Sequence, residues 1–230
     1  VLQAPISSYT ISGSTIVFAA ALTTDDVIDF ITVLGDVLDL GVPSDGAVGN
    51  TQLADTLKVG KQSIWVPATS MVPTASNGCA SVATVETTSG RPDMNVLDFD
   101  KDSDEHAQFS VAFPKSWNAG TVTFQFFWSG LAATTGVSMG LQGVAFADND
   151  SIDTAYGTAV VVDDDAQGAV EELLVSAESG AVTIAGSPGD DELCYFRIFR
   201  DVSDSNDDMA GDCRLHGVKL FFTVDAYNDA

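Results

Sequence analysis

Alternation of apolar and polar residues in short segments is the feature that most constrains the fold of this chain. The segment TVTFQFFW (121–128) has an apolar residue at every even-numbered position, and VKLFFTVDA (218–226) repeats the pattern. Side chains of a β-strand point alternately to its two faces, so each segment offers one face to a core and the other to water. Strands of this kind are typical of antiparallel sheets with one solvated side.

The same pattern recurs throughout residues 61–230, between turns rich in Gly, Pro, Asn and Asp. Many short strands without a sequence repeat predict an all-β fold, here an antiparallel β-sandwich of the jelly-roll type. The segment 163–179 is compatible with a helix or with a loop followed by a strand. The expected strands are 62–68, 81–88, 108–114, 121–128, 136–146, 157–163, 181–186, 194–202 and 218–226.

Residues 41–60 are rich in Gly and lack strand alternation, which predicts a neck or linker between an N-terminal β connector (1–40) and the sandwich (61–230). Leu53 and Leu57 are four residues apart and share one face of a short helix. Such a helix is too short to be stable alone in water. Packing against copies of itself around a symmetry axis would bury these leucines. The candidate oligomerisation residues are Val48, Leu53 and Leu57.

The formal net charge of −24 argues against two classes of partner. No basic cluster is available to neutralise a phosphate backbone, so nucleic-acid binding is not expected. An anionic membrane surface would repel the chain, and no apolar run is long enough for a membrane span. No signal-peptide pattern is visible at the start of the sequence. A solvated acidic surface explains the charge most simply, and cation binding is the alternative.

The three cysteines, Cys79, Cys194 and Cys213, show no metal-binding spacing. Cys194 falls in an expected core strand, where a free thiol behaves as a small apolar side chain. We therefore expect no disulfide framework, which fits a protein assembled in a reducing cytosol.

Two dense acidic segments, 98–106 and 201–212, superficially resemble calcium-binding loops. Ser103 and Met209 stand where an EF-hand loop needs its glycine, so neither segment is an EF-hand. A Ca²⁺ site of another kind and a solvated loop both remain open. The candidate ligand-binding residues, for a sugar or a subunit interface, are Asp204, Asn206 and Asp208 of the second segment, together with Trp117.

Trp117 lies in the turn-like segment PKSWNAG, where its ring can be exposed for sugar stacking or a subunit contact, or can pack against the end of the sandwich. Trp65 and Trp128 fall on strands and are expected in the core. Arg197 and Arg200 stand among acidic residues and are expected to form ion pairs within or between subunits.

Residues 136–140 form a literal G-x-S-x-G motif around Ser138, and Asp201 or Asp204 with His216 would complete the chain order of a hydrolase triad. The flanking residues continue as a strand rather than as the strand–turn–helix that such a nucleophile needs. A glycine-softened strand therefore explains the motif, and no enzymatic activity is expected. His106 and His216 stand alone, without metal-ligand spacing.

The N-terminal region carries a resemblance to a known family. A hairpin (YTISGSTIVF, 9–18), a strand (TTDDVIDFITVLG, 23–35) and a neck (VPSDGAVGNTQLADTL, 42–57) follow one another. In this order they resemble the stem and connector modules of fibre proteins of tailed bacteriophages. The phrases AQFSVAFPKSWNAGTVTFQFFW and YFRIFRDVSDSNDDMAGD resemble phage virion proteins as well, in which no active site is implied.

The resemblance implies a homotrimeric fibre on the virion surface, assembled in the host cytoplasm. Its N-terminal region would attach to other virion proteins, and its C-terminal sandwich would be displayed for adhesion to a host receptor or surface glycan. A head fibre or capsid decoration protein is one alternative, and a carbohydrate-binding module of jelly-roll type is another. No cofactor is implied beyond the Ca²⁺ alternative at the acidic loops.

Overall fold

The structure is a computed structural model that describes residues 8–12, 15–25, 27, 59–130, 134–169, 172–189 and 191–226. The chain divides into two compact units, Val1–Gly49 and Asn50–Ala230. The expected neck helix lies outside the described residues, as do its candidate oligomerisation residues Val48, Leu53 and Leu57. The expected strand 23–35 is described only as far as a turn at residues 24–25 and the single residue Val27.

The first unit contains the hairpin that the sequence predicts. Strands β1 (Tyr9–Ser12) and β2 (Thr15–Phe18) pair antiparallel, in a register that sets Tyr9 opposite Phe18. The two β-prone runs thus pair with each other as expected, and the predicted hairpin is confirmed.

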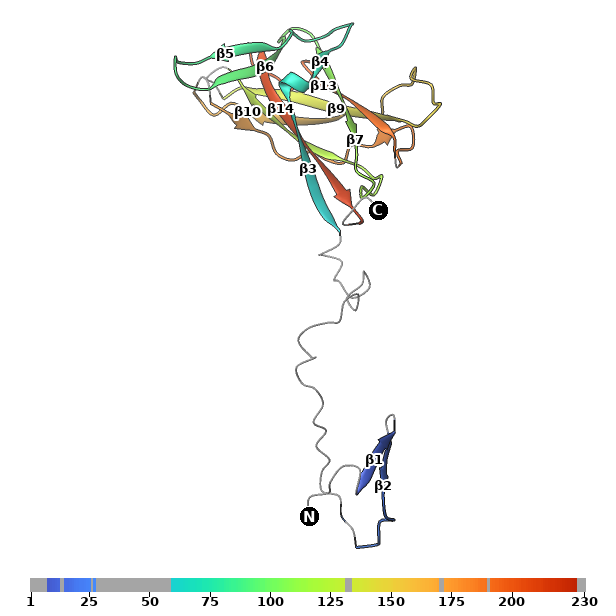
Figure 1. Ribbon diagram of the computed structural model, residues 1–230. Helices are drawn as coiled ribbons and strands as arrows, with labels where there is room; N and C mark the ends of the chain where they lie inside the picture. The colour runs from blue at the N-terminus through green and yellow to red at the C-terminus, as the bar shows by residue number, and fades with distance from the viewer. Residues whose placement is uncertain are drawn as a thin grey trace. The chain divides into compact units, whose positions relative to one another are not determined.

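The second unit is a sandwich of two β-sheets (Figure 1). The first sheet has the strand order β10-β9-β13-β7-β4, with β12 beside β9, and the second has the order β11-β8-β14-β6-β5, with β3 beside β14. Every pairing is antiparallel except that of β12 with β9. The bounds are β3 Gly60–Pro67, a 3-10 turn Ala68–Ser70, β4 Val72–Pro73, β5 Ala83–Glu86, β6 Asp93–Phe99, β7 His106–Ala112, β8 Thr123–Ser129, β9 Gly136–Phe146, β10 Val160–Asp165, β11 Leu174–Val175, β12 Ile184–Ala185, β13 Leu193–Arg200 and β14 Cys213–Val224.

Successive strands from β6 to β9 alternate between the two sheets, and β13 and β14 take the central places of their sheets. Strand β14 pairs with β8 along one side and with β6 and then β3 along the other, with a β-bulge between Leu215 and Gly217. This crossing from sheet to sheet is jelly-roll connectivity, and the predicted antiparallel β-sandwich is confirmed.

The core lies between the sheets and is built from the apolar positions of the alternating segments. Phe124, Phe126 and Trp128 of β8 are fully buried, and Leu220 of β14 packs in the same cluster. Complete burial of one large apolar side chain stabilises a fold by about 1.5–3 kcal/mol, so these strands contribute a large share of the stability. Cys79, Cys194 and Cys213 are buried free thiols, and Cys194 lies in a core strand as expected. Burial raises the pKa of Cys79 and of Cys194 to about 12.

Several segments differ from the sequence-based expectation, among them the two-residue strand β4, which was not predicted. Strand β6 was not predicted, because its apolar residues Val96, Leu97 and Phe99 are set among acidic residues that read as a loop. The helical alternative for 163–179 is wrong: the described residues there form the end of β10, a loop and β11.

Two serine hydroxyl groups bind the segment that follows β11 to strand β8. The Ser176 Oγ accepts a hydrogen bond from the Phe126 backbone N–H at 3.1 Å, and the Ser179 Oγ accepts one from the Phe124 N–H at 2.9 Å. Both hydroxyls also donate to neighbouring carbonyl groups, so their hydrogen-bonding capacity is used locally. The backbone N–H groups at this edge of β8 thus find hydrogen-bond partners in the serine hydroxyl groups, and the segment does not form a helix. None of the helical elements in the described ranges is long and apolar enough to cross a membrane.

Candidate functional site

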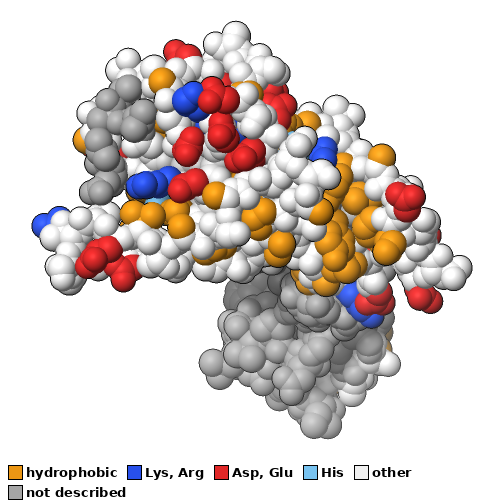
Figure 2. Space-filling view, turned by 90° about the horizontal axis from the view of Figure 1, so that it is seen from above, with side chains coloured by type: hydrophobic (Ala, Val, Ile, Leu, Met, Phe, Trp, Pro, Cys, Tyr) orange, Lys and Arg blue, Asp and Glu red, His pale blue; other side chains and the backbone are white. Residues whose placement is uncertain are grey.

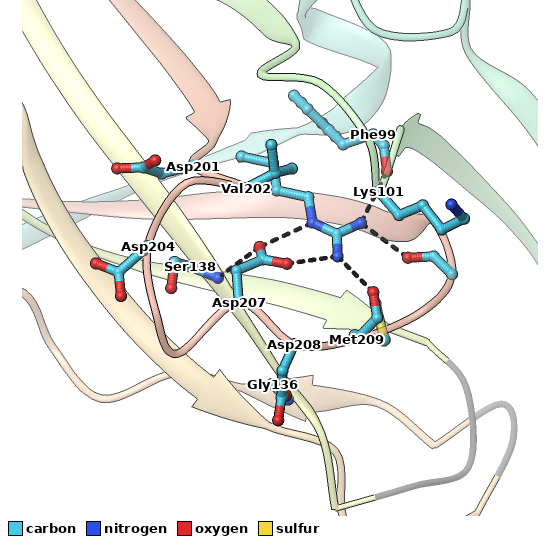
Figure 3. Close-up of polar contacts among 12 residues, drawn as sticks. Phe99, Lys101, Gly136, Ser138, Asp201, Val202, Asp204, Asp207, Asp208 and Met209 are labelled. Atoms are coloured by element: carbon cyan, nitrogen blue, oxygen red, sulfur yellow. Dashed lines mark hydrogen bonds and ion pairs between the residues drawn. The ribbon is translucent and has the colours of Figure 1, made fainter.

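The acidic loop 201–212 is folded around a buried cation, Arg200 at the end of β13 (Figure 3). Its guanidinium group is completely buried and donates to both carboxylate oxygens of Asp207, at 2.7 and 2.9 Å. It also donates to the carbonyl oxygens of Met209, at 3.0 Å, and Gly211, at 2.8 Å. Burial by itself lowers the pKa of Arg200, but the hydrogen bond and charge of Asp207 outweigh it and the pKa is raised. The expected ion pair of Arg200 is therefore confirmed.

The predicted ligand residues of this loop close it onto the neighbouring strands. The Asp204 Oδ1 accepts from the Asn206 backbone N–H at 2.9 Å, and the Asn206 Nδ2 donates to Asp163 at 2.8 Å. The Asp208 Oδ1 accepts from the Gly136 N–H at 2.8 Å. Within the described parts of the chain no three His, Cys, Asp or Glu side chains are grouped to hold a metal ion. A role in ligand binding for Asp204, Asn206 and Asp208 stays a prediction.

The G-x-S-x-G motif forms the first half of strand β9, not a nucleophile elbow. Ser138 is buried and its Oγ donates to Asp163 Oδ1 at 2.7 Å. His216 lies on β14 in the other sheet, where its Nε2 is 3.0 Å from the Ser129 Oγ. The structure thus places the serine and the histidine in different sheets with different partners.

Trp117 has a buried ring rather than an exposed one. Its side chain is 4% exposed and its indole packs on Phe113 with the ring centroids 4.2 Å apart. The backbone of Trp117 bridges to Val224 at the end of β14, which closes this end of the sandwich. The alternative of packing against the sandwich end is the one that the structure shows, and the buried indole has no free face for a sugar.

Trp65 was expected in the core, and this expectation is wrong, because its side chain is 47% exposed. Its neighbours Ile64 and Val66 turn toward the core, so alternation along β3 points Trp65 to the outer side of the sheet. Trp128 is fully buried, as expected, and its Nε1 donates to Asp164 at 2.7 Å. Burial raises the pKa of Asp164, and this hydrogen bond opposes the shift.

A glycine on the neighbouring strand makes room for the Trp65 ring. A Cβ atom at Gly217 of β14 would lie 2.6 Å from two atoms of the indole, which is closer than any real contact. The edge of the indole therefore lies directly over the backbone of Gly217. On the far side, Phe127 of β8 meets Trp65 edge to face, with centroids 4.9 Å apart and an interplanar angle of 80°. The tryptophan is thus held across three adjacent strands rather than left as a loose surface side chain.

Polar and aromatic side chains continue this surface along the same strands. Lys219 stands opposite both Trp65 and Gln125 in the strand register, and Phe221 stands opposite Thr123. We call this outer surface the Trp65 face. Its residues are Lys61, Trp65, Thr123, Gln125, Phe127, Lys219 and Phe221.

The Trp65 face is locally basic in a strongly acidic chain. The ammonium groups of Lys61 and Lys219 each lie 5.0 Å from the centroid of the Phe221 ring. Lys61 forms an ion pair with Glu178, and its hydrogen bond, followed by that of Thr123, lowers the pKa of Glu178. Lys219 forms no ion pair with any described residue. Its charge is left available at the centre of the face.

A shallow hollow of about 40 Å³ lies farther along β14, between Met94, Leu173, Arg214 and His216. Burial, followed by the charge of Arg214, lowers the pKa of His216, so its ring is neutral at neutral pH. Enclosed small-molecule sites usually have volumes of about 300–1,000 Å³, so this hollow is no such site. In Figure 2, apolar side chains form a broken band across the surface and acidic side chains gather in groups beside it.

Comparison with known proteins gives similarity of strand arrangement only. No protein-family model and no curated protein sequence matches the chain. Among solved structures, a family 35 carbohydrate-binding module from Clostridium thermocellum has 12% identity and a TM-score of 0.41, over 69% of this chain and 97% of that one. A CBM35 module from Cellvibrio japonicus Abf62 has 9% identity and a TM-score of 0.40, over 69% and 92%. A CBM28 module described as specific for non-crystalline cellulose has 12% identity and a TM-score of 0.35, over 70% and 87%.

Replacing Arg200 with methionine is expected to destabilise the sandwich strongly. The substitution leaves Asp207 as an uncompensated buried carboxylate, and breaking a buried pair in this way typically costs about 3–5 kcal/mol. Urea unfolding followed by circular dichroism measures the loss. Arg91→Met, at an exposed position, is the matched control and should change the stability little. Equal stability of the two variants would show that the Arg200 contacts do not hold the loop.

Acrylamide is expected to quench the fluorescence of one tryptophan in three, because Trp65 is exposed while Trp117 and Trp128 are buried. Trp65→Phe should remove nearly all of the quenchable fraction and leave a blue-shifted emission. Trp117→Phe should leave the quenchable fraction unchanged. Quenching that survives Trp65→Phe would contradict the outward position of this ring.

Proposed function

We propose that the β-sandwich is a non-catalytic carbohydrate-binding domain and that a sugar chain lies across the Trp65 face. The observation that carries this proposal is the fixed, half-exposed indole of Trp65, set over Gly217 and against Phe127. An aromatic ring in this position is not required by the core, which is already filled by the residues of the inner face. Trp65 is also continuous with Phe127 and Phe221 on the same face, and contiguous exposed apolar surface of this kind is a mark of binding sites.

Sugars suit such a ring because a pyranose carries C–H groups on one flat face and hydroxyl groups around its rim. The electron-rich face of an indole attracts those C–H groups, while the apolar contact removes water from both partners. Phe127 meets Trp65 edge to face and keeps the indole from turning when a sugar approaches. Pre-ordering of this kind lowers the entropy cost of binding.

The hydroxyl groups of a sugar find partners next to the ring. The Gln125 side chain donates from Nε2 to the carbonyl of Ser176 at 2.8 Å, which fixes its amide and leaves its Oε1 as an acceptor. Lys219 supplies ammonium donors in the same cross-strand row. The face thus offers a sugar one aromatic ring flanked by a hydrogen-bond acceptor and a donor.

The face is open rather than enclosed, which favours a chain of sugars over a single buried one. A polymer can contact Trp65 and extend along the strands toward Phe221 or toward the hollow beside His216. Open contact of this size gives modest affinity, which display in several copies would raise by avidity. The homotrimeric fibre and its role in host adhesion stay predictions, with which sugar binding is compatible.

Trp65→Ala is expected to weaken binding to a soluble polysaccharide at least tenfold, which corresponds to about 1.4 kcal/mol. The intact chain is first screened by affinity electrophoresis against neutral and acidic polysaccharides, and the dissociation constants are then measured by calorimetry. Val72→Ala, at an exposed residue of the other sheet, is the control and should bind as the parent does.

Two results would overturn the proposal. One is the absence of binding to every polysaccharide of the panel by the parent protein. The other is unchanged affinity of Trp65→Ala for a glycan that the parent binds, which would place the binding surface elsewhere.

A further inference from the structure

A second cluster of aromatic and polar side chains lies on the outer side of the other sheet, around Arg197 of β13. In the strand register Arg197 stands between Gln108 of β7 and Gln142 of β9. Its Nε and Nη2 donate to the same Gln142 oxygen, at 3.0 and 2.5 Å. The sequence predicted an ion pair for Arg197, and the structure shows a neutral amide in its place.

A tyrosine from the loop after β9 lies against this guanidinium group. The centre of the Arg197 guanidinium lies 5.0 Å from the centroid of the Tyr156 ring. Burial raises the pKa of the Tyr156 phenol, the charge of Arg197 opposes that shift, and Tyr195 adds to it. The guanidinium group and the Tyr156 ring therefore lie in direct electrostatic contact.

Arg197 is held without a carboxylate partner in a chain that has 33 acidic residues. Arg200, three residues away, is different, because Asp207 binds its guanidinium group bidentately. No described residue forms an ion pair with Arg197, and its Nη1 has no hydrogen bond among the described residues. The edge of the guanidinium formed by Nη1 and Nη2, which can match a carboxylate, therefore has no partner among the described residues, and the bonds to Gln142 hold the group in a fixed orientation.

Aromatic rings flank this polar row on both sides. Phe199 covers Gly140, where a Cβ atom would lie 2.3 Å from the ring, and it stacks on His106 at 5.5 Å. On the other side Tyr195 meets Phe146 edge to face at 6.0 Å. A ligand whose anionic group binds Arg197 would thus also have these aromatic side chains within reach of its own ring.

We propose that the Arg197 cluster is a second binding site, specific for the carboxylate of an acidic sugar residue such as a uronate. The guanidinium takes the carboxylate, the Gln108 amide is placed to meet a ring hydroxyl, and the aromatic rings take the apolar side of the sugar. The net charge of −24 repels anions at a distance, but that repulsion is screened beyond about 8 Å at physiological ionic strength. A carboxylate in contact with Arg197 lies closer to the guanidinium group than this screening length, so their attraction is not screened. This site is on the opposite sheet from the Trp65 face and does not depend on it.

Calorimetry and NMR of the full chain with trigalacturonate, and with its neutral methyl ester, test the proposal. We expect the ester to bind at least tenfold more weakly than the acid, and the Arg197 Nε–H resonance to shift with the acid alone. Arg197→Gln should lose at least tenfold in affinity for the acid, and Arg197→Lys should lose less. Arg91→Gln removes a charge from the exposed connection between β5 and β6 and should bind trigalacturonate as the parent does.

Several outcomes would overturn the proposal. They are equal binding of the acid and the ester, unchanged affinity of Arg197→Gln, and no binding at millimolar concentration. Binding of an acidic peptide in preference to trigalacturonate would also overturn it, because it would show a protein ligand. Loss of trigalacturonate binding in Trp65→Ala but not in Arg197→Gln would assign the ligand to the Trp65 face. The comparison of acid with ester needs no variant, so a folding defect of Arg197→Gln would not block the test.

Discussion

Burial of apolar side chains between two sheets is the constraint on which the rest of this structure depends. Once Phe124, Phe126 and Trp128 face the core, every intervening residue of β8 must face outward. The same rule sets Trp65 outside because Ile64 and Val66 lie inside, and sets Arg197 outside because Phe196 and Ile198 are buried. The two outer surfaces are thus consequences of the core.

The basic side chains of the sandwich differ in whether a carboxylate of the same chain binds them. Arg200 is surrounded by Asp207 and three backbone carbonyl groups and organises the acidic loop that follows it. Lys219 and Arg197 lie at the surface without carboxylate partners among the described residues, although acidic groups are abundant. Each of these two surfaces therefore combines an uncompensated positive charge with ordered aromatic rings, in a protein that is otherwise strongly acidic.

The sequence predicts the sandwich well, because alternation is a local signal with one physical cause. The expected strand 136–146 agrees with β9 at both ends, and the hairpin of β1 and β2 is present. Strand β6 escaped prediction because its apolar run is short and set among acids that favour loops elsewhere in the chain. The segment after β10 was ambiguous because the contacts that straighten it come from β8, far away in the sequence.

The site was harder to predict than the fold. Trp65 was given the wrong exposure, although alternation around Ile64 and Val66 carried the signal for it. For Trp117, which lies in a turn, the sequence left an exposed ring and a packed ring both open. The space over Gly217 depends on strand pairing and has no local signature. The phage-fibre resemblance rests partly on segments outside the described residues, so it stays a prediction beside the proposed sugar-binding role.

Mapping of a bound neutral oligosaccharide by NMR is the most direct test of the central claim. The oligosaccharide is chosen from the neutral polysaccharides that the intact chain retains, and amide and indole resonances are followed during the titration. Carbohydrate binding at the Trp65 face predicts that the largest shifts fall on the Trp65 indole N–H and on outward residues of β3, β8 and β14. Shifts confined to other strands or to the acidic loop, with the Trp65 indole unmoved, would contradict it.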